Sequence, residues 1–302
     1  MTAHPPALPD SAFPALYRSA DRLSLQGQRA FLRATKTRLV LAVVAAVSAA
    51  FSLRIGGGPV DVMAIAGAVA FAAVACLELY LAFRRPEAQW YDGRAVAESA
   101  KTLAWRYAVG ASPFRIGAAS AEEDVRAYYR DQLAELLHDA PSTSIAATTE
   151  AAVSEQLQAM RSRPFHERRE AYLAGRIEDQ RNWYASKSEY NRRRAGLWRI
   201  VLVTAEGSGI LTAVLRAFDV FSVDLAGICA ALVGSAAAWL AVKQHASLER
   251  AYAFAANELA ITHSRLSDVQ EEAVWAAEVS DAEEAISREH TMWRASRSTD
   301  PG

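Results

Sequence analysis

The residue best suited to chemistry is Glu206, an ionisable side chain near the middle of an apolar run at residues 200–215. Thr204 and Ser208 flank it in the sequence. An ionisable group at membrane depth is costly and usually faces a protein interior or a water-filled cavity. We therefore expect Glu206, with Thr204 and Ser208, to line or gate a polar path. The alternative is a protonated glutamate that hydrogen-bonds a neighbouring helix, and the sequence leaves both roles open.

The other reactive residues form no pattern that predicts a site. The histidines lack a metal-binding spacing, and the GGG at residues 56–58 does not follow a strand, so it is not a phosphate loop. Cys76 and Cys229 lie inside apolar runs, which predicts small buried side chains and no disulfide. We expect no cofactor, no metal and no enzymatic activity. The formal net charge of -1 argues against a nucleic-acid-binding protein, which needs a basic face.

The elements that must position Glu206 are four apolar runs joined in pairs by short turns. They predict membrane helices at about residues 39–54, 62–83, 198–215 and 225–242. Three of the runs are short against the roughly 20 residues of a typical span, so their ends must include flanking aromatic or basic residues. We expect an all-α membrane protein with two transmembrane hairpins. The alternative is a soluble helical bundle with two buried hairpins.

The distribution of basic residues favours the membrane. The two turns contain only Arg54 and Arg216, whereas the outer ends of the hairpins carry Arg18, Arg22, Arg29, Arg33, Lys36, Arg38, Arg84, Arg85, Arg192, Arg193, Arg194, Arg199, Lys243 and Arg250. Cytoplasmic flanks of membrane helices carry such an excess of basic residues. We expect a multi-pass protein of the bacterial inner membrane with both termini in the cytoplasm. Glu78, near the cytoplasmic end of its run, is within reach of Arg84 or of the membrane interface, and we expect it to have a structural role.

The two halves of the chain resemble a duplication. A shift of about 160 residues places the first hairpin on the second, and Glu98 on Glu258. Small residues recur at every fourth position in the second helix of each hairpin: Ala64, Ala68, Ala72 and Cys76 in one, Ala226, Ala230, Gly234 and Ala238 in the other. Such a spacing lets helix backbones approach closely in lipid.

Two polar and aromatic stripes follow helical spacing outside the apolar runs. The first, on a helix predicted from Pro86 to about Gly110, consists of Trp90, Arg94, Glu98, Lys101 and Trp105. The second consists of Tyr172, Arg176, Asp179, Trp183, Lys187 and Tyr190. Residues from about 247 to 297 predict a long amphipathic helix with a break near Ser280. We expect these helices to form a cytoplasmic bundle, and the stripes to form the interfaces of the bundle or of an oligomer.

Three segments also carry a resemblance to a known family: WYDGRAVAESAKTLAWRYAVGASPF at residues 90–114, YLAGRIEDQRNWYASKSEYNRRR at 172–194 and AISREHTMW at 285–293. They resemble bacterial SLATT domains, which are two-helix membrane modules associated with nucleotide-sensing conflict systems. The first segment is similar to one subtype and the other two to another, so the resemblance implies two fused domains. It implies a pore-forming effector and, as partners, the lipid bilayer, further copies of the chain and a nucleotide-signalling sensor or synthase.

The expected organisation is a disordered tail at residues 1–14, a first SLATT-like domain at 15–139, a linker at 140–165 and a second SLATT-like domain at 166–297. The predicted function is an oligomeric pore that permeabilises the host membrane in antiphage defence. A membrane scaffold that recruits a cytoplasmic signalling partner without conducting ions is the alternative. A transporter is less favoured, because the two repeats have the same orientation in the membrane.

Overall fold

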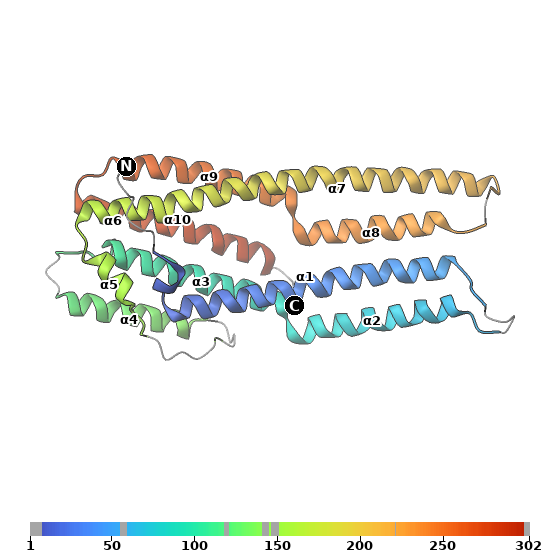
Figure 1. The fold of residues 1–302 in the computed structure, drawn as a ribbon, viewed down its shortest axis with the longest axis horizontal. Coiled ribbons are helices and arrows are strands. Elements are labelled where there is room, and N and C mark those ends of the chain that lie inside the picture. Colours follow the sequence, from blue (N-terminus) through green and yellow to red (C-terminus); the bar gives the residue numbers. More distant parts are fainter. Residues whose placement is uncertain are drawn as a thin grey trace. The chain divides into compact units, whose positions relative to one another are not determined.

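Almost all of the chain is helical (Figure 1). The computed structural model describes residues 8–54, 59–117, 121–140, 145, 151–220 and 222–298, and for 288–298 only the backbone. The helices are α1 (Ala15–Ala50), α2 (Val62–Arg84), α3 (Pro86–Val109), α4 (Glu122–His138), α5 (Glu155–Arg161), α6 (Phe165–Tyr172), a π-helical turn (Leu173–Glu178), α7 (Asp179–Ala217), α8 (Leu225–Lys243), α9 (His245–Ser267) and α10 (Glu272–Ser298). No strand occurs in these ranges beyond one isolated bridge between Arg54 and Asp61. The all-α prediction is confirmed.

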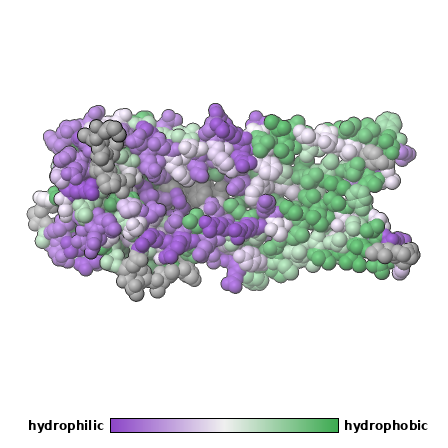
Figure 2. Space-filling model, in the orientation of Figure 1, coloured by the Kyte–Doolittle hydropathy of each residue, from purple (hydrophilic) through white to green (hydrophobic). Residues whose placement is uncertain are grey.

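The chain divides into two compact units, and each half of the sequence contributes to both. The hairpin unit comprises Arg29–Pro86 and Ser186–Ala253, and the bundle unit comprises Met1–Gln28, Glu87–Ala185 and Phe254–Gly302. Hydrophobic side chains predominate on the visible face of the membrane-helix part of the hairpin unit, whereas hydrophilic ones predominate on that of the bundle unit (Figure 2). This difference in surface is typical of a protein with a lipid-facing part and a water-facing part.

Three helical stretches in the described part of the chain are long and apolar enough to cross a membrane: Val62–Val109, Phe165–Ala217 and Leu225–Ser267. Their apolar windows correspond to α2, the second half of α7, and α8. The predicted first span, at about residues 39–54, is not among them. From Leu39 to its end at Ala50, α1 extends only about 18 Å, against a hydrocarbon core of about 30 Å. A fourth span therefore remains a prediction.

The two hairpins are built alike, as the proposed duplication predicts. Asp61 caps α2 by accepting hydrogen bonds from the backbone N–H groups of Met63 and Ala64, and Asp224 caps α8 by accepting one from Gly227. At the other end, α2 and α8 each stop at a residue in the left-handed conformation, Arg85 (φ 44°) and Gln244 (φ 49°). In both cases the next helix begins directly after that residue.

Within the hairpin unit, small residues hold neighbouring helices together. A Cβ atom at Gly67 of α2 would lie 3.5 Å from the Cβ of Ser48 in α1, and one at Gly209 of α7 would lie 3.3 Å from the Cβ of Cys229 in α8. The Ser235 hydroxyl donates to the carbonyl of Leu39 at 3.4 Å, which joins α8 to α1. At these glycines, the absence of a side chain allows the neighbouring helix to approach closely.

The small-residue stripes predicted for α2 and α8 do not lie on the faces that make these close contacts. Ala64, Ala68, Ala72 and Cys76 are all exposed on α2; in α8, Ala230 and Gly234 are exposed and Ala226 and Ala238 are half-buried. The predicted burial of Cys76 is therefore wrong for the single chain, because the outer face of α2 carries this residue. Cys229 is half-buried, and both cysteines are free.

The bundle unit has an aromatic core contributed by both halves. Its fully buried large side chains include Trp105, Tyr107, Tyr129, Tyr172 and Trp275. Part of the predicted disordered tail belongs to this core: residues 1–7 lie outside the described part, but Asp10–Ala12 form a 3₁₀ turn, and Ala12 and Phe13 are buried. Part of the predicted linker, Glu155–Arg161, forms the helix α5.

The C-terminal segment is broken earlier than predicted. Helix α9 ends at Ser267 and α10 begins at Glu272, whereas Ser280 lies inside α10. The Ser280 hydroxyl accepts a hydrogen bond from Arg106 at 2.9 Å. Since that contact satisfies its side chain without disturbing the backbone, the serine is compatible with an uninterrupted helix.

Candidate functional site

Glu206 lies on the outer surface of α7 in the hairpin unit. Its side chain is exposed, and no residue of the apolar window of α7 is buried within the chain. Among the described residues, none forms a hydrogen bond or an ion pair with it. The fold therefore presents an ionisable group on a lipid-facing helix without a partner among the described residues.

The structure separates Glu206 from the two hydroxyl residues predicted to accompany it. Residues two positions apart point to different sides of an α-helix. Thr204 and Ser208 share one face, where the Ser208 hydroxyl donates to the Thr204 carbonyl at 2.8 Å. Thr212 continues that face, and its hydroxyl donates to the carbonyl of Ser208 at 2.9 Å. The hydroxyls of Ser208 and Thr212 are thus satisfied within α7 itself, a common arrangement in membrane helices.

Glu78 forms an ion pair with Arg38, a residue that the sequence did not indicate as its partner. Its carboxylate lies 2.6 Å from Nη1 of Arg38. The ion pair therefore joins α2 to α1. Both side chains are partly exposed, and the pair is therefore a weak tie between the helices.

The first stripe lies in the bundle unit and faces the inside of the chain. Trp105 is 1% exposed and packs edge-on against Tyr172, with ring centroids 5.7 Å apart. Glu98 is buried and pairs with Arg94 at 2.7 Å. Trp90 is half-buried and stacks on its neighbour Tyr91. Most of this stripe is therefore covered by the chain itself and is not free to contact another subunit.

Lys101 completes the first stripe by resting on aromatic rings. Its ammonium lies 5.5 Å from the ring centroid of Phe13 and 5.8 Å from that of Tyr17. Burial lowers the pKa of Lys101, and the nearby Arg176 lowers it further, while Glu98 opposes the change. The aromatic faces stabilise a cation that has lost much of its water.

The second stripe is divided by the π-helical turn Leu173–Glu178. Tyr172 and Arg176 are buried as predicted for an interface, but Asp179 and Trp183 are exposed. A π-helical turn adds one residue to a helical repeat, so the positions after it shift by one. The buried face accordingly continues through Ile177, Gln180, Tyr184 and Asn191. This shift places Asp179 and Trp183 outside the interior of the bundle unit, and their place in an oligomer interface stays a prediction.

A charged cluster lies at the centre of the bundle unit. Arg176 is 1% exposed and donates two hydrogen bonds to Glu283, at 2.9 and 2.8 Å. The hydroxyls of Thr102 and Tyr172 donate to the same carboxylate, at 2.8 and 2.9 Å. Glu283 is therefore fully paired, as a buried carboxylate must be. The cluster joins α3, the π-helical turn and α10, and so both halves of the sequence.

The protonation states of this cluster follow from its surroundings. Burial opposes the charge on Arg176, but the adjacent Glu283 outweighs it and raises the guanidinium pKa above its ordinary value. Burial, together with the charge of Glu283, raises the pKa of Tyr172 well above its usual value. Tyr172 is therefore protonated and Arg176 charged at any physiological pH.

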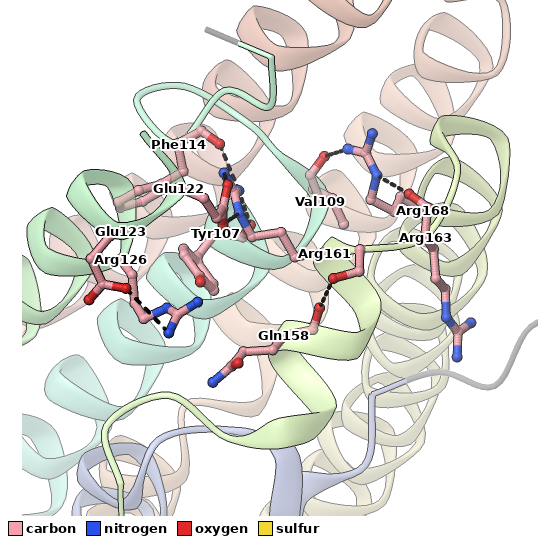
Figure 3. A network of polar contacts seen from close by, with 11 residues as sticks. Tyr107, Val109, Phe114, Glu122, Glu123, Arg126, Gln158, Arg161, Arg163 and Arg168 are labelled. Atoms are coloured by element: carbon pink, nitrogen blue, oxygen red, sulfur yellow. Dashed lines mark hydrogen bonds and ion pairs between the residues drawn. The ribbon is translucent and has the colours of Figure 1, made fainter. Parts of the chain in front are cut away.

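A second network of arginines caps the carboxyl end of α3 (Figure 3). Arg161 donates to the carbonyls of Tyr107 and Phe114, both at 2.8 Å, and pairs with Glu122 of α4. Arg168 donates to the carbonyl of Val109 at 2.7 Å. The last carbonyls of a helix lack partners within it and carry partial negative charge, which the two guanidinium groups satisfy.

The same network connects the two halves of the sequence. Arg168 of α6 pairs with Glu272 at the start of α10, and the indole N–H of Trp275 donates to the Val109 carbonyl at 3.4 Å. The backbone N–H of Ser112 donates to the carbonyl of Ala276 at 2.8 Å. The loop after α3 is thus fixed to α10.

Sequence reasoning did not identify Glu283, Arg161 or Arg168. A signal for Glu283 was present, because Ala276, Val279 and Ile286 share its helical face and are all buried. No comparable signal marks Arg161, which lies in the segment expected to be a linker.

Comparisons with known proteins match two parts of the chain to related families. Residues 14–169 match the family described as "SMODS and SLOG-associating 2TM effector domain 3", and residues 172–293 match "SMODS and SLOG-associating 2TM effector domain 1". No curated protein and no solved structure matches the chain. The first match ends at residue 169 and the second begins at residue 172, so they meet within α6, between Arg168 and Arg176, which join the two halves.

Proposed function

Since the chain belongs to the SLATT family of SMODS and SLOG-associating two-transmembrane effector domains, two of which it carries in tandem, we propose that it is a membrane effector that acts as an oligomeric pore. In this proposal both hairpins span the bacterial inner membrane, both termini are cytoplasmic, and opening of the pore permeabilises the host cell in antiphage defence. The role is not enzymatic. A nucleotide-signalling sensor or synthase is the proposed source of the activating signal.

The observation that carries the proposal is the exposure of Glu206 on a lipid-facing helix. A charged residue at the centre of a membrane helix costs about 3 kcal/mol on insertion scales, and such residues nearly always face protein or water. In the described part of the single chain, the Glu206 side chain is exposed and has no hydrogen-bond or ion-pair partner. A second subunit, or water in a channel between subunits, would supply the missing surroundings.

Further features support an oligomer assembled through the hairpin unit. The stripe Ala64, Ala68, Ala72 and Cys76 is exposed on α2 and would allow another helix to approach closely. The first aromatic stripe is largely covered within the bundle unit and so offers little surface to another subunit. A few helices per chain cannot enclose an aqueous path, and a ring of identical subunits with closed symmetry would do so.

Leakage from liposomes tests the proposal. Purified protein reconstituted at low density should release a small entrapped dye or dissipate an ion gradient, and Glu206→Leu should abolish this release. Thr204→Val, on the other face of α7, is the matched control and should leak as the unchanged protein does. Leakage that is unaffected by Glu206→Leu would exclude the proposed path. Retention of the dye by all three proteins, while the chain is monomeric in the membrane, would favour the scaffold.

A further inference from the structure

The hairpin unit contains a cavity with a cationic rim at the end of its second hairpin. The cavity has a volume of about 450 Å³ and is lined by Ala195, Arg199, Leu202, Leu240, Gln244, His245, Ala246, Ser247 and Arg250. These residues come from α7, from the end of α8 and from the first turn and a half of α9. The volume is in the range of small-molecule sites.

The cavity lies at the level where the membrane helices meet water. Trp198 and Trp239 flank it in the sequence, and the Lys243 ammonium lies 5.7 Å from the ring centroid of Trp239. Tryptophan and basic residues gather at the boundary between hydrocarbon and headgroups. The apolar lining residues Leu202 and Leu240 lie on the membrane side of Arg199 and Gln244 in their helices. One wall thus suits an acyl chain and the other a headgroup.

The charged lining is of one sign only. Arg199 and Arg250 are exposed, and neither guanidinium forms a hydrogen bond or an ion pair with another residue in the described part of the chain. No acidic side chain lines the cavity. Unlike Arg161, Arg168 and Arg176 in the bundle unit, these two arginines have donors free for an anion.

The backbone adds to the positive potential of the same cavity. Gln244 interrupts the helix between α8 and α9. The first helical hydrogen bond of α9 runs from the N–H of Leu248 to the Gln244 carbonyl. The N–H groups before Leu248 therefore lack acceptors within the helix and lie at its positive end. The side chain of His245 is fixed there by Asn191, with Nδ1 and Oδ1 2.7 Å apart.

We infer that this cavity binds the phosphate headgroup of an anionic phospholipid, held by Arg199 and Arg250, with the start of an acyl chain against Leu202 and Leu240. A phosphate diester presents oxygens that guanidinium groups bind in pairs. The inference rests on membrane insertion of the second hairpin and not on pore formation. It assigns the chain a lipid that would fix the junction between α8 and α9.

Native mass spectrometry of the full chain in neutral detergent tests the inference, with added dioleoyl phosphatidylglycerol or dioleoyl phosphatidylcholine. The unchanged protein should retain phosphatidylglycerol in preference to phosphatidylcholine. The double variant Arg199→Gln/Arg250→Gln should bind phosphatidylglycerol about 30-fold more weakly, from the contribution of each basic residue near an anionic lipid. Arg199→Lys/Arg250→Lys should recover part of the affinity, which shows that the site is still folded.

The matched control is Arg192→Gln/Arg193→Gln. These two arginines are exposed on α7, the helix that also carries Arg199, and both pair with Glu189. They do not line the cavity, but their replacement changes the net charge by the same amount. The control should bind phosphatidylglycerol as the unchanged protein does. An equal loss in both double variants, or equal binding of the two lipids, would overturn the inference. Displacement of phosphatidylglycerol by millimolar inorganic phosphate would identify free phosphate as the ligand and overturn the lipid assignment.

Discussion

Arg176 and Glu283 illustrate how a buried charge is tolerated when every polar atom of the carboxylate has a partner. We predict that Glu283→Gln destabilises the protein by about 3–5 kcal/mol, because it leaves the guanidinium charge buried without its counterion. Thermal unfolding in detergent, followed by circular dichroism, measures the effect. Replacing both residues, as Arg176→Met/Glu283→Met, should be less damaging than Glu283→Gln alone. A Glu283→Gln protein as stable as the original would show that the pair does not hold the bundle unit together.

The residue-level predictions succeeded where helical spacing was uninterrupted. The spacing of Trp105 and Glu98 in α3 indicated an interface, and both are buried. Asp179 and Trp183 lie outside the buried face of the bundle unit, because periodicity alone does not reveal a π-helical turn upstream. Their place in an oligomer interface stays a prediction. The partners of Glu283 lie more than a hundred positions away in the sequence. The sequence could therefore indicate that Glu283 is buried, but not which residue it pairs with.

The close approach of α1 and α3 depends on Gly93. A Cβ atom there would lie 2.8 Å from the backbone nitrogen of Ser24 and 2.9 Å from the carbonyl oxygen of Ala20. Gly93→Ala should therefore separate the two helices and destabilise the protein by about 1–3 kcal/mol, despite the better helix propensity of alanine.

Gly196→Ala in α7 is the control for Gly93→Ala, because a Cβ at Gly196 meets nothing within 4 Å. It should leave the melting temperature unchanged or raise it. If the two variants had equal melting temperatures, the backbone contact between α1 and α3 would not be tight in solution.

The membrane helices were largely predictable from the sequence, whereas the bounds of several helices outside the apolar runs were not. Runs of apolar residues located α2, α8 and the C-terminal end of α7 within a few positions, since length and hydropathy alone define a membrane helix. The start of α7, at Asp179, lies well before the predicted residue 198. The break at residues 268–271 was missed, because no glycine or proline marks it. Helix α5 was missed because its residues pack against partners distant in the sequence, and a short polar segment carries no local signal for such packing.

At the scale of the molecule, the duplication accounts for the repeated design of the hairpins. Each begins its second helix with an aspartate cap and ends it with a left-handed residue. Within the bundle unit, Arg168 and Arg176 pair with residues of α10 and so join the two halves of the sequence.

Ion selectivity across a planar bilayer tests most directly whether Glu206 faces a conducting path. Rings of acidic side chains favour cations and rings of basic side chains favour anions. Protein with Glu206 should therefore give a cation-selective current, and Glu206→Lys should shift the reversal potential toward that of an anion-selective channel. A current whose selectivity is identical in the two proteins would contradict the account, since Glu206 would then lie outside the path.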